Sequence, residues 1–181
     1  MLRAAAFAVA DMLTVCSITG FLVLYLNTPG SPGTFSKSVL AAMPGAAGVR
    51  ALDLDGDGDV DIVVVGVTQS AVYVLRSWLH DGAGAPQAFV PSQVFPAAVV
   101  VSTGVPAVDL IEVADVDGDG TLDLLAGSTT SDMIVWVTRD PGSELDEPAG
   151  WTTLPVALPV GGLLSMAAGD VDAGVWSCRV C

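Results

Sequence analysis

The chain has 181 residues, of which 52% are hydrophobic, and its 20 acidic residues far outnumber its 6 basic ones. So large an apolar fraction excludes a disordered chain and provides enough side chains for a core. The net charge of −14 argues against nucleic acid and against anionic membranes as partners, because both repel an acidic protein.

The N-terminal stretch is mostly apolar and admits two interpretations. Arg3 followed by an apolar run to Leu26 is compatible with a secretory signal or a membrane anchor. Asp11 argues against a spanning helix, because an acid at the centre of such a helix costs about 2.5 to 3.5 kcal/mol. Residues 21–31 also align without a gap with residues 133–143, which favours the strands of a repeat. We favour strands, with a signal or anchor as the alternative.

An aspartate-rich loop follows at residues 53–61, with the sequence DLDGDGDVD. Ca²⁺ takes six to eight oxygen ligands, and carboxylates at alternate positions of a tight turn supply them from one short segment. Closely packed carboxylates repel one another unless a cation lies between them, and the intervening glycines let the backbone curl around an ion. The expected ligands are the side chains of Asp53, Asp55, Asp57 and Asp61 and the backbone carbonyl of Asp59.

The residues after this loop predict strands. The run 61–66 is short, apolar and closed by glycine, which is typical of a buried strand and leaves no room for the second helix of an EF-hand. The twelfth loop position, where an EF-hand carries glutamate, holds Val64. Further strands are expected at 71–75 and 88–90, on either side of a glycine-rich turn at 82–86.

The same motif returns at residues 115–123 as DVDGDGTLD, again followed by a short apolar run. The expected ligands are the side chains of Asp115, Asp117, Asp119 and Asp123 and the backbone carbonyl of Thr121. The two loops hold five and four acids, so nine of the 20 acidic residues lie in them. The alternative to calcium is a pair of Asp-Gly surface turns without a metal.

The loops mark a repeat, and the repeat predicts the architecture. We expect each loop to open the first strand of a sheet, in a unit of two strands, a turn and two more strands. Such units match the four-stranded antiparallel blades of a β-propeller, which bury their faces only against neighbouring blades. We therefore predict an all-β, partial β-propeller of about three blades. A propeller has roughly four to eight blades, so we expect a fragment, with ring closure by another copy or frayed end blades as alternatives.

The expected units divide the chain into four parts. They are residues 1–49 for a partial first blade, 50–111 for the second blade with its calcium loop, 112–168 for the third blade with its loop, and 169–181 for the truncated start of a further repeat and an atypical tail. Asp170 and Asp172 begin a third loop whose remaining acids are missing. Cys178 and Cys181 in the tail lack the second pair or nearby histidine of a zinc site, and Cys16 fits a small buried side chain.

The sequence does not favour an enzyme. The single histidine, His80, lies between Ser77 and Asp81, and three residues so close in sequence do not reach the geometry of a catalytic triad. Glu144 and Glu147 lie in an expected turn between strands, which gives no support to catalysis by paired carboxylates. The chain also lacks the glycine-rich motifs that bind dinucleotides or phosphate.

The pattern Asp-x-Asp-Gly-Asp-Gly-x-x-Asp before a short strand resembles the VCBS and FG-GAP repeats of integrin α-chain propellers and of many secreted or surface proteins. The resemblance extends over roughly residues 11–172, and it implies a calcium-stabilised, usually extracellular β-propeller. Integrin repeats tend to continue Gly-Ala-Pro where this chain has Gly66 and Gly127 followed by other residues, so the plainer VCBS type fits better.

Two function classes follow. One is a secreted or cell-surface module for calcium-dependent adhesion or for binding an unidentified protein or glycan ligand. The other is a structural accessory repeat of a larger secreted or membrane protein, whose catalytic domain lies outside this chain.

Overall fold

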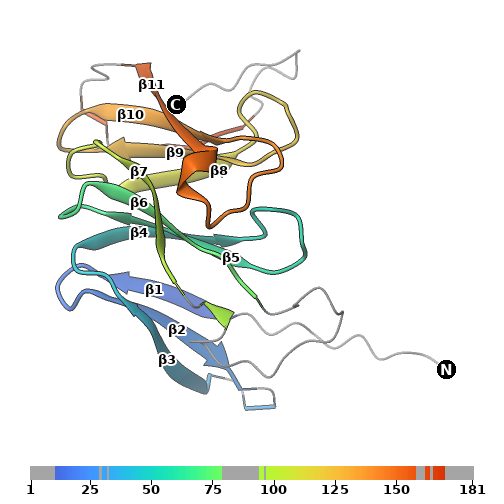
Figure 1. Ribbon diagram of the computed structural model, residues 1–181. Coiled ribbons are helices and arrows are strands. Elements are labelled where there is room, and N and C mark those ends of the chain that lie inside the picture. Colours follow the sequence, from blue (N-terminus) through green and yellow to red (C-terminus); the bar gives the residue numbers. More distant parts are fainter. Residues whose placement is uncertain are drawn as a thin grey trace.

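A computed structural model describes residues 11–28, 30–31, 33–78, 94–95, 97–157, 162–163 and 165–169. The described strands form three antiparallel sheets that lie one beside the next in chain order (Figure 1). None of them closes on itself within these ranges. The all-β prediction and the partial, propeller-like arrangement of sheets are therefore confirmed.

The first sheet has three described strands in the order β1-β2-β3, with bounds Met12–Cys16, Phe21–Asn27 and Phe35–Ala42. The strands favoured for the N-terminal stretch are thus present from residue 12 to residue 27. Residues 1–10 lie outside the described ranges. No helix in the described part of the chain is long and apolar enough to span a membrane.

The second and third sheets are four-stranded, as predicted. The second has the order β4-β5-β6-β7, with bounds Ala46–Leu52, Asp61–Gly66, Ala71–Leu75 and Val99–Thr103. The third consists of β8, β9, β10 and β11 in spatial sequence, with bounds Leu110–Ala114, Asp123–Ser128, Met133–Arg139 and Trp151–Ala157. A 3-10 turn at Pro148–Gly150 precedes β11.

The strand that completes the second sheet is β7, which pairs with β6 through partners such as Val72 and Ser102. The strand expected at 88–90, the glycine-rich turn before it, His80 and the tail from residue 170 all lie outside the described ranges.

The expectation that each loop opens the first strand of its sheet is wrong. The loop at 53–60 joins β4 to β5, which pair through Leu52 and Asp61, and the loop at 115–122 joins β8 to β9, which pair through Ala114 and Asp123. All six residues of β5 are buried, whereas β4 has a single buried residue. Because β4 has so weak an apolar pattern, the sequence did not indicate that it pairs with β5. β8 likewise has a single buried residue beside the fully buried β9.

Side chains of β5 alternate between two cores, because successive residues of a strand point to opposite faces. Val63 and Val65 lie in a core shared with the third sheet, where Leu124 and Val137 also lie. Ile62 and Val64 lie in a second core, together with side chains of the first sheet. The second sheet is therefore covered on both faces, which is the packing that neighbouring blades require.

Candidate metal centres

The two aspartate loops lie on the same side of the stack of sheets (Figure 1). In each, the last acid of the motif is also the first residue of the following strand, Asp61 in β5 and Asp123 in β9. These two side chains are 0% and 1% exposed. Burying a carboxylate is energetically costly unless hydrogen bonds or a positive charge compensate it. The groups around each buried aspartate therefore indicate whether the loop can hold a cation.

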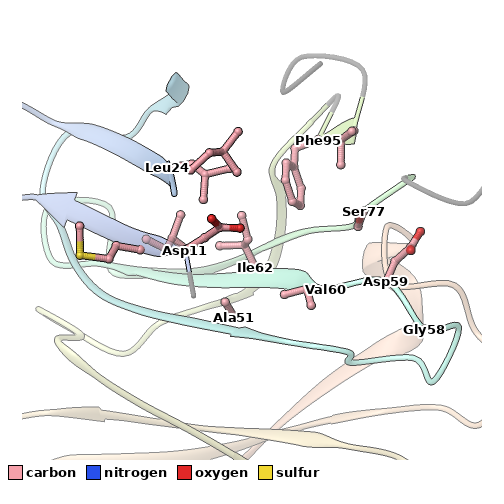
Figure 2. A pocket seen from close by; sticks show the side chains of 13 residues that line it. Asp11, Leu24, Ala51, Gly58, Asp59, Val60, Ile62, Ser77 and Phe95 are labelled. Carbon is pink, nitrogen blue, oxygen red and sulfur yellow. The ribbon is translucent and has the colours of Figure 1, made fainter. Parts of the chain in front are cut away.

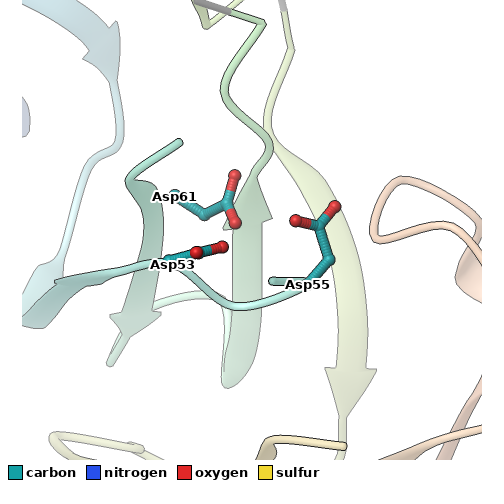
Figure 3. Close-up of side chains that lie close together, drawn as sticks. All are labelled: Asp53, Asp55 and Asp61. Atoms are coloured by element: carbon teal, nitrogen blue, oxygen red, sulfur yellow. The ribbon is translucent and has the colours of Figure 1, made fainter. Parts of the chain in front are cut away.

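In the first loop, the carboxylates of Asp53, Asp55 and Asp61 converge, and one oxygen from each lies within 4.8 Å of the other two (Figure 3). The backbone N–H groups of Gly56 and Gly58 donate to the two oxygens of Asp53, at 2.8 and 3.0 Å. Both glycines have positive φ angles, 79° and 93°, which residues with a Cβ resist. The curled backbone therefore fixes the position of the Asp53 carboxylate.

Asp61 accepts two backbone hydrogen bonds that tie the loop to the sheet. Leu54 N–H donates to Oδ2 at 3.0 Å, and Ser77 N–H donates to Oδ1 at 2.7 Å. Leu54 follows β4 and Ser77 follows β6. A single side chain at the start of β5 thus connects the ends of three adjacent strands.

The second loop repeats this geometry. Oxygens of Asp115, Asp117 and Asp123 lie within 4.8 Å of one another. Asp115 accepts from the N–H groups of Gly118 and Gly120 at 2.7 and 3.1 Å. The two loops differ in sequence, yet both place the acids at the first, third and ninth positions of the motif close together.

Asp123 differs from Asp61 in its hydrogen bonding. Its Oδ2 accepts from the N–H of Val116 at 3.0 Å. Its Oδ1 is buried, and hydrogen bonds from the side chains of Thr138 and Trp136 lower the pKa of this carboxyl. A buried carboxylate is costly to leave without compensation, and Asp123 contributes one oxygen to the second triad. A cation at the triad would compensate its charge, so an all-oxygen set of this kind fits a hard cation.

The structure does not bring every predicted ligand into the triads. The Oδ1 atoms of Asp57 and Asp119 accept from the N–H groups of Asp59 and Thr121, at 2.8 and 2.7 Å, just as those of Asp55 and Asp117 accept from the N–H groups two residues later. Only Asp53, Asp55, Asp61 and their counterparts converge. Ligation by Asp57 and Asp119, and by the carbonyls of Asp59 and Thr121, stays a prediction.

Burial raises the pKa values of acids in both loops. Burial raises the pKa of Asp61 to about 6, although hydrogen bonds from Ser77 and Leu54 oppose the rise. Burial also raises the pKa of Asp55, and the neighbouring charge of Asp57 adds to this effect. In the second loop, burial raises the pKa of Asp123. Each of these shifts is one that a bound cation would reverse, because opposite charge favours the ionised form.

Arg76, directly after β6, is a functional candidate that the sequence did not reveal. Its Nη2 lies 3.3 Å from Oδ2 of Asp55. On its other side it pairs with Glu144 and lies 3.9 Å from Asp146, both between β10 and β11 of the third sheet. Its guanidinium carbon also lies 4.6 Å from the ring centre of Trp78. The partners are far apart in sequence, so no local motif could have indicated them.

A cavity of about 440 Å³ lies beside the first loop, between the first and second sheets (Figure 2). Gly58, Asp59 and Val60 form its wall on the loop side, and apolar side chains such as Leu24 and Phe95 line much of the remainder. Asp59 is 1% exposed. The cavity thus borders the first loop, and the converging carboxylates do not line it.

The residues considered for catalysis have other partners where they are described. Ser77 contributes its backbone N–H to Asp61. Glu144 pairs with Arg76.

A comparison with known protein families supports the interpretation of the two loops as repeat motifs. The family model of the FG-GAP-like repeat matches residues 53–126, which begins at the first acid of the first loop and includes the whole of the second. No curated protein and no solved structure matches the chain. The matched segment contains both triads and the core between the second and third sheets. Residues 53–126 thus match the FG-GAP-like repeat, one of the families that the loop motif resembles.

Proposed function

We propose that this chain is a calcium-binding β-propeller repeat module that acts outside the cell in adhesion or ligand binding. The observation that carries the proposal is the pair of carboxylate triads, each with oxygens within 4.8 Å and each ending in a buried aspartate. Burial raises the pKa of both Asp61 and Asp123, which supports a cation beside them rather than a set of plain surface turns. Oxygen-only ligands favour Ca²⁺ over softer metals.

In this function, Asp53, Asp55 and Asp61 would hold one ion, and Asp115, Asp117 and Asp123 would hold a second. Bound calcium would supply positive charge that lets buried acids stay ionised. Backbone N–H groups of each loop orient its first acid, Asp53 or Asp115. Further backbone N–H groups hold its last acid, Asp61 or Asp123. The module is proposed to be non-catalytic, with a protein or glycan as the ligand of the rigidified face.

Thermal unfolding in calcium and in chelator tests the metal. An ion that binds the folded state stabilises it by RT ln(1 + [L]/Kd), about 2.7 kcal/mol at a hundredfold excess over Kd. The double variant Asp55→Ala, Asp117→Ala should lose the calcium effect. Asp140→Asn, an exposed acid outside both loops, is the matched control and should keep it. Equal midpoints in calcium and chelator for the unmodified chain would refute the proposal.

The alternative is a structural accessory repeat in a larger secreted or membrane protein, in which calcium only stabilises the fold. Both functions predict the same thermal shift, so a binding assay must separate them. Calcium-dependent retention on an array of glycans and extracellular proteins, lost in chelator, supports the binding module. Stabilisation by calcium without any such retention supports the accessory repeat.

A further inference from the structure

The two triads are alike in their acids and unlike in their surroundings. Arg76 stands beside the first triad and forms an ion pair with Asp55 at 3.3 Å. Thr138 occupies the matching place in the third sheet, at the same separation from Asp123 as Arg76 has from Asp61. Within the described ranges, the ion pairs found include none with Asp117, the counterpart of Asp55.

The Arg76 pair is shielded from solvent. The side chains of Arg76 and Asp55 are 16% and 12% exposed, so water and salt screen their interaction less than that of a surface pair. The guanidinium of Arg76 also lies over the ring of Trp78 and forms an ion pair with Glu144. A positive charge is therefore built into the wall of the first triad.

We propose that Arg76 sets the calcium affinity of the first loop by competing with the ion for Asp55, so that this loop binds calcium more weakly than the second. The inference rests on the proposed calcium function and adds the residue that distinguishes the two sites. Because Glu144 and Asp146 lie on the far side of the guanidinium, Arg76 keeps partners when calcium takes Asp55. Filling the first loop therefore transfers Arg76 towards the third sheet.

The size of the effect follows from Coulomb's law. Even at the dielectric constant of water, a unit charge about 6 Å from a divalent ion weakens its binding about tenfold. Arginine stays protonated throughout the accessible pH range, so the competition persists wherever the protein is folded.

Calorimetric titration with CaCl₂ in an Asp117→Asn background, which leaves the first loop as the remaining site, tests the inference. Arg76→Gln should lower the Kd of that site about tenfold, and Arg76→Lys, which keeps the charge, should change it much less. Arg50→Gln is the matched control, because Arg50 also pairs with an acid of the third sheet, Glu112, but has no contact with a loop acid among the interactions described. It should leave the Kd unchanged.

Glu144→Gln gives an independent test with the opposite sign. Loss of Glu144 leaves Arg76 more dependent on Asp55, so calcium should bind the first loop more weakly. This variant retains Arg76 and its stacking on Trp78, and it keeps the inference testable if Arg76→Gln does not fold.

The outcomes separate this inference from the proposed function. The inference alone would be overturned if Arg76→Gln bound calcium no more tightly than Arg50→Gln does. That result would indicate that Arg76 orients Asp55. If Arg76→Gln does not fold, Glu144→Gln decides: calcium binding as tight as in the unmodified first loop, or tighter, would also overturn the inference alone. A complete lack of calcium binding by the unmodified chain would overturn the inference together with the calcium function.

Discussion

In the absence of calcium, the protein should lose stability as the pH rises from about 4 to about 6, and Asp61 should account for a defined part of that loss. Burial raises the pKa of Asp61 from 3.8 to about 6. Between these values the folded state retains a proton that the unfolded state has released. The free energy of unfolding therefore falls with increasing pH across this window and levels off above it. The shift of about 2 pKa units corresponds to about 3 kcal/mol.

Asp61→Asn isolates this contribution, because asparagine has nearly the same shape and does not titrate. The variant loses one acceptor for the N–H of Leu54 or Ser77, which should cost about 1 to 3 kcal/mol at every pH. That cost is independent of pH. The informative quantity is the difference in unfolding free energy between the unmodified chain and the variant, which should fall by about 3 kcal/mol between pH 4 and pH 7.

Urea unfolding at several pH values, with chelator present throughout, measures this difference. Asp55 and Asp123 also have raised pKa values, but they are present in both proteins and their effects largely cancel. If the two stability curves stay parallel from pH 4 to pH 7, burial does not raise the pKa of Asp61 and the electrostatic argument fails.

Three further predictions concern the metal, the core and a turn. Calcium affinity should increase with pH up to about 6 and then level off, because Asp61 must be ionised to bind; titrations with CaCl₂ at pH 5 and pH 7 that give equal affinities would contradict this. Leu124→Ala, at a fully buried position of the core between the second and third sheets, should lower the free energy of unfolding by about 2 to 5 kcal/mol in urea titrations, and a loss below 1 kcal/mol would show that the core is loosely packed. Gly45→Ala should destabilise more than Gly30→Ala in the same assay, because both have φ of 78° but only a Cβ at position 45 meets another residue, 2.1 Å from Oγ1 of Thr68; equal losses would show that the turn yields.

The triads were predictable because their geometry is local. Asp53, Asp55 and Asp61 lie within one short segment, and glycines with positive φ set its curvature, so spacing alone brings these acids together. The same local reasoning could not separate Asp57 from them. Asp55 and Asp57 each accept the N–H two residues later, yet only Asp55 lies in the triad, so the two acids have the same signature in sequence.

The strand before each loop and the arginine beside the first triad were not predictable, for two different reasons. β4 and β8 carry few buried residues, so periodicity could not show that they pair with β5 and β9. The contacts of Arg76 depend instead on how two sheets pack. Glu144 reaches Arg76 only because the turn between β10 and β11 lies against the end of β6, and nothing in the sequence around either residue specifies that approach.

The corrected position of the loops changes what a bound ion can do. A loop that merely preceded a sheet would hold calcium at its margin, and losing the ion would disorder the loop alone. The observed loops lie between paired strands, and Asp61 accepts N–H groups that follow β4 and β6 while itself beginning β5. Charge repulsion among the three acids would therefore act on three strand ends at once when no ion is bound. Because β5 contributes to the cores on both faces of the second sheet, calcium in this loop would stabilise the packing between sheets as well as the loop itself.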